Sequence, residues 1–100
     1  MPIVGGLGCA KPATEAVQAL CEQVKAEVEE KHKKKYPQFE AVEFKTQLVS
    51  GTNYFVKIRV GDEEYIHVCL YKTLPHAGDK LSLTATQTQK TKEEEIVHFQ

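Results

Sequence analysis

The stretch Ala41–Val60, AVEFKTQLVSGTNYFVKIRV, decides the fold. Apolar and polar side chains alternate on both sides of a central SGTN, and this period of two is typical of strands with one buried face. Ser50–Asn53 has the composition of a turn. A connection this short joins antiparallel neighbours, because a parallel crossover is much longer. The stretch therefore predicts an antiparallel hairpin.

Two further alternating runs follow the hairpin, at residues 65–71 and, more weakly, at 81–85. Turn-like sequences precede them at Gly61–Glu63 and Pro75–Asp79. We therefore expect a meander of four antiparallel strands. We also expect the side chains that alternate with the apolar ones to meet water on the opposite face: Glu43, Lys45, Lys57, Arg59 and His67.

Before the hairpin, the apolar residues recur with a period close to that of an α-helix. Five of them share one helical face: Val17, Leu20, Cys21, Val24 and Val28. Thr14 suits the N-cap, and Tyr36-Pro37 is expected to stop the helix, because proline lacks an N–H and disfavours helix in the residue before it. The apolar faces of one helix and one sheet are both buried when the helix lies across the sheet. The sequence predicts an α+β fold, with one long N-terminal helix packed across an antiparallel β-sheet.

Two segments flank this body, and together with it we expect them to form a single domain over residues 1–100. Residues 1–12 are rich in glycine and proline, which resist both helix and strand, so we expect a flexible N-terminal trunk. Residues 90–95 are polar and charged. The apolar residues that follow them, Ile96, Val97 and Phe99, are expected to pack back onto the body.

Composition limits the function classes. The chain has 41% hydrophobic and 27% charged residues and a formal net charge of -1, which describes a soluble globular protein without the basic excess of a nucleic-acid binder. No apolar run is long enough to span a membrane, and residues 1–14 lack the features of a signal peptide. The three cysteines, Cys9, Cys21 and Cys69, are an odd number at irregular spacing. We expect a reduced, cytoplasmic protein with free thiols, bound neither to nucleic acid nor to a membrane.

No group of residues predicts catalysis, a metal site or a cofactor. His67 and Cys69 share a face of one strand, but nothing identifies a group to orient the histidine, and we expect both to be surface residues. The four histidines form no ligand pair, and each is expected at the surface. Gly6-Leu7-Gly8 lacks the preceding strand and the spacing of a phosphate-binding loop.

Apolar residues also stand where turns are normally polar. They are Pro2, Ile3 and Val4 on the trunk, Leu48 and Val49 before Gly51, and Leu74 and Pro75 before the last strand. Alternate connections of a meander fall at the same end of the sheet, so these sites are expected to form one edge that binds a partner. The alternative is that Leu48 and Leu74 complete the core at strand ends.

Several segments resemble the stefins, the intracellular branch of the cystatin family. They are GGL, AKPAT, EEK, AVEFKTQ, QLVSGTNYFVKIRVGDEEYIHV and YKTLP, and the likeness runs from Gly5 to Phe99. The most specific mark is QxVxG, met by Gln47, Val49 and Gly51 and followed at once by TNYF.

The resemblance implies a reversible, tight-binding inhibitor of papain-like cysteine proteases such as the lysosomal cathepsins, and not an enzyme. A wedge of trunk and two hairpin loops would occlude the active-site cleft. Gly5 would be the trunk hinge, with Pro2, Ile3 and Val4 in unprimed subsites. Gln47, Leu48, Val49, Ser50 and Gly51 would lie at the cleft centre, and Leu74 and Pro75 on the primed side.

The target preference, the oligomeric state and the class of partner each allow more than one interpretation of the sequence. Stefins commonly have QVVAG, so Leu48 and Ser50 are expected to alter the ranking of target proteases. Cys9, if exposed, offers an intermolecular disulfide. We expect mostly monomer, with a domain-swapped dimer formed through a hinge at Gln47–Gly51 as the other form. A module that binds a non-protease partner at the same edge is the alternative function, and a small enzyme using Cys69 is a more distant one.

Overall fold

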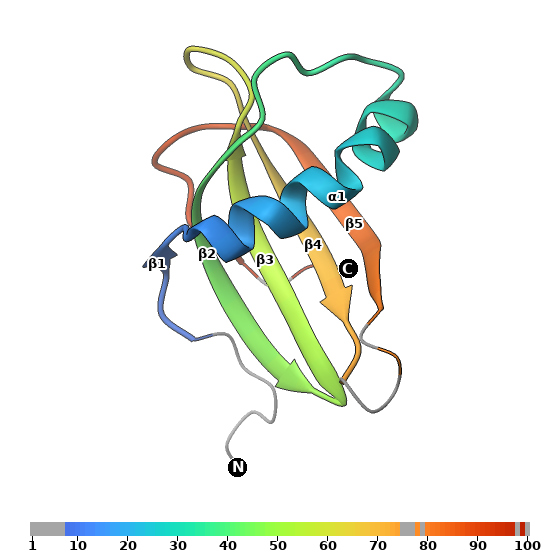
Figure 1. Ribbon diagram of the computed structural model, residues 1–100. Helices are drawn as coiled ribbons and strands as arrows, with labels where there is room; N and C mark the ends of the chain where they lie inside the picture. The colour runs from blue at the N-terminus through green and yellow to red at the C-terminus, as the bar shows by residue number, and fades with distance from the viewer. Residues whose placement is uncertain (1–7, 75–77, 79, 98, 100) are drawn as a thin grey trace.

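The computed structural model describes residues 8–74, 78, 80–97 and 99, and they form one helix and a five-stranded sheet (Figure 1). The elements are β1 (Lys11–Pro12), α1 (Glu15–His32), β2 (Glu40–Val49), β3 (Gly51–Arg59), β4 (Tyr65–Lys72) and β5 (Leu81–Lys90). The strands lie in chain order and every neighbouring pair is antiparallel. The predicted α+β fold, with the helix across an antiparallel sheet, is confirmed.

Helix α1 begins where the sequence indicates and ends earlier. The Thr14 hydroxyl accepts a hydrogen bond from the Val17 amide at 3.2 Å, which satisfies one of the free amides at the helix start. The helix ends at His32, because Lys33 adopts a left-handed conformation with φ 54° and its amide turns back to Glu29 and Glu30. The expectation that the helix continues to Tyr36-Pro37 is therefore wrong.

The main core lies between α1 and one face of the sheet. All five apolar helix residues predicted to share a face are buried, and they pack against buried side chains of β3 and β4 such as Val56, Ile58 and Val68. Burying a valine or leucine side chain is worth about 1.5–3 kcal/mol. This face therefore fixes the position of the helix across the strands.

The N-terminal segment departs from the prediction that residues 1–12 avoid strand. Lys11 and Pro12 pair with Phe44 and Glu43 at the edge of the sheet, and the Gly8 amide donates to the Thr46 carbonyl at 3.1 Å. Proline is tolerated in an edge strand, where it needs no partner for an N–H. The result is a fifth, two-residue strand in place of a purely irregular trunk.

The second face of the sheet is also largely covered, so the expectation that it meets water is wrong for Lys57 and His67, which are buried, whereas Glu43 and Arg59 remain partly exposed. A C-terminal segment (residues 91–97 and 99) lies over it, and Ile96 forms a second apolar cluster with Phe55 and Cys69. The Phe55 and Phe99 rings meet edge to face, with centroids 5.6 Å apart. Ile96 and Phe99 thus pack onto the body as expected, whereas Val97 remains exposed.

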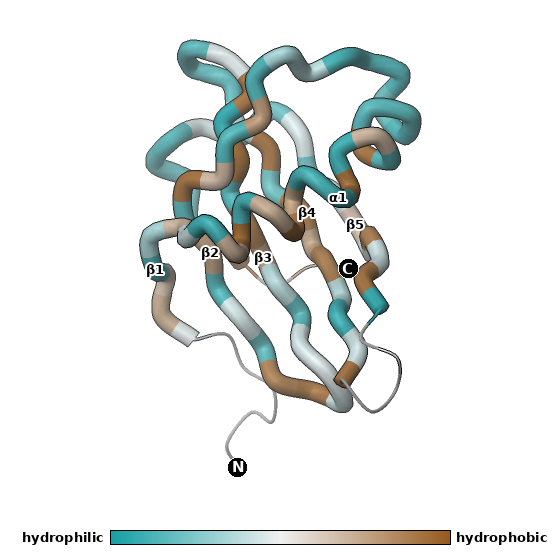
Figure 2. Tube along the Cα trace, viewed as in Figure 1, coloured by the Kyte–Doolittle hydropathy of each residue, from teal (hydrophilic) through white to brown (hydrophobic). Residues whose placement is uncertain are grey.

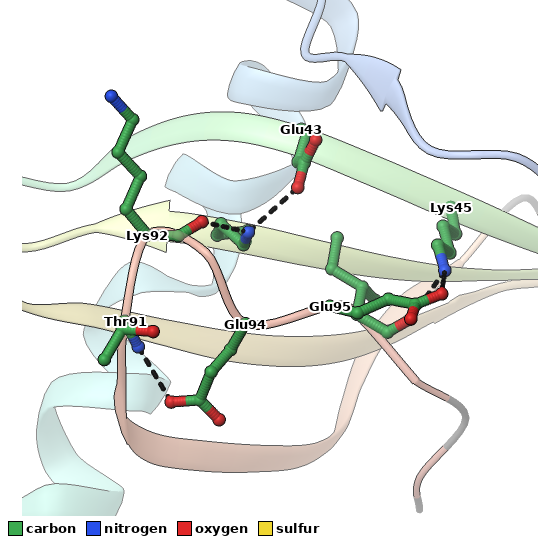
Figure 3. A network of polar contacts seen from close by, with 8 residues as sticks. Glu43, Lys45, Thr91, Lys92, Glu94 and Glu95 are labelled. Carbon is green, nitrogen blue, oxygen red and sulfur yellow. Dashed lines mark hydrogen bonds and ion pairs between the residues drawn. The ribbon is translucent and has the colours of Figure 1, made fainter.

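Two lysines hold the C-terminal segment to the sheet (Figure 3). Lys57 donates to the Lys92 carbonyl at 2.6 Å and forms an ion pair with Glu43 at 2.9 Å. Lys45 donates to the Ile96 carbonyl at 2.7 Å and lies 3.1 Å from the Glu95 carboxylate. Lys57 is only 3% exposed, so its ammonium is buried with partners that replace water.

Candidate functional site

The turn between β2 and β3 is tighter than predicted. Val49 and Gly51 are strand partners, so Ser50 alone turns the chain, and the expectation that Thr52 and Asn53 belong to the turn is wrong. Gly51 has φ +125°, and a Cβ on it would lie 2.6 Å from the Lys72 carbonyl oxygen. Only glycine meets both demands, since other residues rarely adopt this φ. We call Leu48–Gly51 the hairpin tip.

The apolar residues of the hairpin tip are exposed. Leu48 is 74% exposed and Val49 47%, while Leu74 after β4 is 39% exposed. With Val97 these are the large exposed hydrophobic residues in the described part of the chain. The alternative in which Leu48 and Leu74 complete the core is therefore wrong. We call Leu48, Val49 and Leu74 the apolar edge; the end of β2, just before the pale β2–β3 turn, is brown in Figure 2.

The two connections that carry the apolar edge lie at the same end of the sheet, as predicted. Thr52 pairs with Lys72, so the chain leaving β4 passes beside the hairpin tip. The Thr73 amide donates to the Lys80 carbonyl at 2.8 Å, which closes the β4–β5 connection near Leu74. The β3–β4 turn containing Gly61 lies at the opposite end (Figure 1).

The N-terminal segment leads toward the same end. Pro12 lies opposite Glu43, Lys11 opposite Phe44, and Gly8 bonds to Thr46, so the chain traced backward runs along β2 toward the hairpin tip. The remaining predicted site residues lie outside the described residues: Pro2, Ile3, Val4, Gly5 and Pro75.

Side chains on the second face of the sheet brace the hairpin tip. Gln47 pairs with Asn53 across the hairpin, and the Asn53 amide donates to the Gln47 side-chain oxygen at 2.8 Å. The next strand contributes Tyr71, whose hydroxyl donates to the Ser50 carbonyl. The alternation places Tyr71 on a strand but gives no signal of this contact. Once the strand register pairs Tyr71 with Asn53, Tyr71 lies diagonally across from Gly51, and this places its side chain beside the turn.

His67 and Cys69, the pair considered for catalysis, are both buried, so the expectation that they are surface residues is wrong. Burial raises the pKa of the Cys69 thiol to about 11, which disfavours the nucleophilic thiolate. Burial, together with Lys57 and Lys90, lowers the pKa of His67 to about 4. Neither ring nitrogen of His67 has a hydrogen-bond partner. This imidazole is neutral at pH 7 and inaccessible to a substrate.

The other candidate groups add no reactive site. His32 is half-buried, with its ring nitrogens 2.8 Å from the Tyr36 and Thr86 hydroxyls, so it ties the end of α1 to β5. Among the described residues, no cluster of three or more histidine, cysteine or acidic side chains could hold a metal ion. No helix in the described ranges is long and apolar enough to cross a membrane.

All three cysteines are free. Cys9 is exposed, whereas Cys21 is buried on the sheet-facing side of α1, where burial raises the pKa of its thiol to about 12. Cys9 therefore remains accessible for the intermolecular disulfide considered from the sequence, and Cys21 and Cys69 do not.

The sequence of the chain is similar to proteins of one known family. Residues 5–93 match the cystatin domain. The chain is 44% identical to human cystatin-B over 95 residues, which cover 95% of this chain and 97% of that protein. It is 45% identical to chimpanzee (Pan troglodytes) cystatin-B over the same proportions of both chains. Human cystatin-A is 45% identical over 97 residues, covering 97% of this chain and 99% of the relative.

Proposed function

Because the chain belongs to the cystatin family, whose members are protease inhibitors and not enzymes, we propose that it inhibits papain-like cysteine proteases by occluding the active-site cleft. The inhibition is reversible and tight. The observation that carries this mechanism is the apolar edge, in which Leu48 is the most exposed of the large hydrophobic residues described. A folded protein keeps such side chains in water at a cost unless a partner covers them.

In this mechanism the hairpin tip enters the centre of the cleft and Leu74, with Pro75, contacts its primed side. Gly51, with its φ of +125°, permits the one-residue turn at Ser50, and the antiparallel pairing through Val49 and Gly51 holds the tip in a defined shape. A preformed tip loses little conformational entropy on binding, so more of the contact energy contributes to affinity.

The trunk supplies the third part of the wedge. The described start of the chain, from Pro12 back to Gly8, lies along β2 in the direction of the tip, which supports roles for Pro2, Ile3 and Val4 in unprimed subsites and for Gly5 as the hinge. Deleting residues 1–5 should weaken inhibition mainly by speeding release of the protease. Unchanged affinity would remove the trunk from the mechanism.

The physiological targets in this proposal are lysosomal cathepsins encountered by a cytoplasmic inhibitor. The support is the similarity to cystatin-B and cystatin-A together with three cysteines that form no disulfide. Leu48 and Ser50, which differ from the common QVVAG, tune the ranking of these targets.

The decisive experiment titrates active papain with the purified protein and measures residual peptidase activity. Stoichiometric loss of activity is expected, and it should be reversible on dilution. Leu48→Ala should weaken the inhibition constant about tenfold or more, because the leucine side chain is buried in the cleft only in the complex. Val97→Ala removes an exposed apolar side chain from the C-terminal segment and should change inhibition less than twofold.

Absence of inhibition by the wild-type protein would refute the proposal. In that case the apolar edge would be the docking surface for a partner that is not a protease of this class.

A further inference from the structure

The backbone of Ser50, at the turn of the hairpin tip, is hydrogen-bonded by a side chain from outside the hairpin. Ser50 is the single residue between β2 and β3, so its carbonyl has no partner in either strand ladder. The Tyr71 hydroxyl, on β4, donates a hydrogen bond to that carbonyl. Tyr71 reaches it because it pairs with Asn53 and lies on the same face of the sheet as Gly51.

Tyr71 and Gly51 are matched in shape. A Cβ at Gly51 would lie 2.8 Å from the Tyr71 hydroxyl oxygen and 3.0 Å from its ring carbon Cε1. The tyrosine ring therefore occupies the space beside the turn that a side chain at Gly51 would need. The ring fills one side of the tip while its hydroxyl holds the backbone.

Further side chains in line with Tyr71 extend this contact across the hairpin. Gln47, Asn53 and Tyr71 form one row of cross-strand partners over β2, β3 and β4. The hydrogen bond of 2.8 Å between Asn53 and Gln47 closes the row on the β2 side. The hairpin tip is thus fastened at two points on the face that lies away from α1.

We propose that Tyr71 is a positioning residue for inhibition: its hydroxyl holds the Ser50 carbonyl so that Leu48 and Val49 meet the protease in one orientation. This inference rests on the proposed function. Tyr71 acts through the tip and is not itself required to touch the protease. Without the hydroxyl, the tip samples other conformations, and the fraction competent to bind falls.

The size of the effect follows from the surroundings of the bond. The residues around it line a hollow of about 430 Å³: Val49, Ser50, Asn53, Tyr71, Ser82 and Thr84. This hollow is open, so water can replace the lost hydroxyl at the Ser50 carbonyl. A neutral hydrogen bond exchanged for water changes an equilibrium constant by about two- to tenfold, and we expect a loss of affinity in this range.

The test compares Tyr71→Phe with Tyr54→Phe. Tyr54 lies on β3 three residues from Gly51 and packs on Phe44 against the helix-facing core, so the control removes a hydroxyl close to the tip but on the opposite face of the sheet. Inhibition constants against papain should rise about two- to tenfold for Tyr71→Phe and less than twofold for Tyr54→Phe. Thermal unfolding and far-UV circular dichroism verify that both variants are folded.

Amide hydrogen exchange in the free protein supplies a readout that needs no protease. Tyr71→Phe should accelerate exchange of the ladder amides next to the tip, in the pairs Leu48–Thr52 and Gln47–Asn53, about two- to tenfold while exchange in α1 stays unchanged. Equal exchange at the tip in wild type and Tyr71→Phe would overturn the positioning role, whether or not papain is inhibited. Faster exchange with unchanged inhibition would overturn its link to binding. If wild type fails to inhibit but the tip loosens in Tyr71→Phe, the proposed function fails and the inhibitory part of this inference fails with it.

Discussion

The buried imidazole of His67 should make the stability of the protein depend on pH between about 6.5 and 4. The side chain is 0% exposed, and neither ring nitrogen has a hydrogen-bond partner. Burial is the main cause that lowers its pKa from 6.5 to about 4, with Lys57 and Lys90 acting in the same direction and Glu94 and Glu43 opposing them. The folded protein therefore keeps His67 neutral at pH values where the unfolded chain binds a proton.

The sign and size follow from this difference in proton binding. Above pH 6.5 His67 is neutral in both states, and its contribution to the free energy of unfolding is fully present. As the pH falls, the unfolded state binds the proton first, so stability declines until the folded state also titrates near pH 4. A pKa lowered from 6.5 to about 4 corresponds to about 3 kcal/mol of stability lost across this interval.

The assay is urea unfolding of wild type and His67→Leu at a series of pH values from about 7.5 to 3.5. Leucine needs no hydrogen bond and cannot take up a proton beside Lys57 and Lys90, so the variant should match or exceed wild-type stability at neutral pH. Every other titrating group is common to both proteins. The difference between their free energies of unfolding should grow by about 3 kcal/mol in favour of His67→Leu as the pH falls to 4. A difference that stays constant from pH 7 to 4 would refute the reasoning.

Three substitutions test other parts of the fold. Gly51→Ala should weaken papain inhibition at least tenfold, because φ +125° and the close Lys72 carbonyl force the hairpin tip to rearrange, and exchange in α1 should be unaffected. Lys57→Met should lower the free energy of unfolding by about 1–3 kcal/mol in urea, because it leaves the Lys92 carbonyl and Glu43 without their buried partner. Thr14→Ala should cost about 1 kcal/mol of thermal stability through loss of the helix cap, and an unchanged melting temperature would contradict it.

The main elements could be predicted because each shows its own period. The apolar residues from Val17 to Val28 repeat at helical spacing, and Val56, Ile58 and Val68 alternate with other side chains, so the sequence alone indicates one buried face of each element. The end of α1 was missed because Lys33 adopts a left-handed conformation that only asparagine or glycine would have signalled. Strand β1 was missed because two residues carry no period, and their pairing is decided by β2.

The burial of the second face of the sheet could not be predicted from the strand sequences. Phe55, Lys57, His67 and Cys69 alternate with core residues and would be the solvent side of an open sheet. Phe55 and Cys69 are buried because Ile96 and Phe99 pack across the sheet, and Lys57 bonds to the Lys92 carbonyl; both contacts join segments far apart in the sequence. No local pattern in β3 or β4 records that a distant segment covers them.

The sequence predicts where the residues of the candidate site stand along the chain, but it does not predict whether their side chains are exposed. Leu48 and Leu74 stand at strand ends, where the same sequence fits either a finished core or a bare tip. The structure decides for exposure, with 74% of Leu48 accessible, because the one-residue turn at Ser50 carries the side chain past the end of the core. The exposure of Leu48 is thus a consequence of the length of the β2–β3 turn, which Gly51 controls.

The cover over the second face also sets an order of events during synthesis. The ribosome makes β2, β3 and β4 before residues 91–97, so a nascent chain can pair these strands and dock α1 while Phe55 and Cys69 still lie open. Lys57 meanwhile has only Glu43 as a partner, because the carbonyl of Lys92 has not yet arrived. A translating or truncated chain therefore exposes an apolar surface of the kind that chaperones bind, and the finished protein loses this surface when Ile96 closes over it.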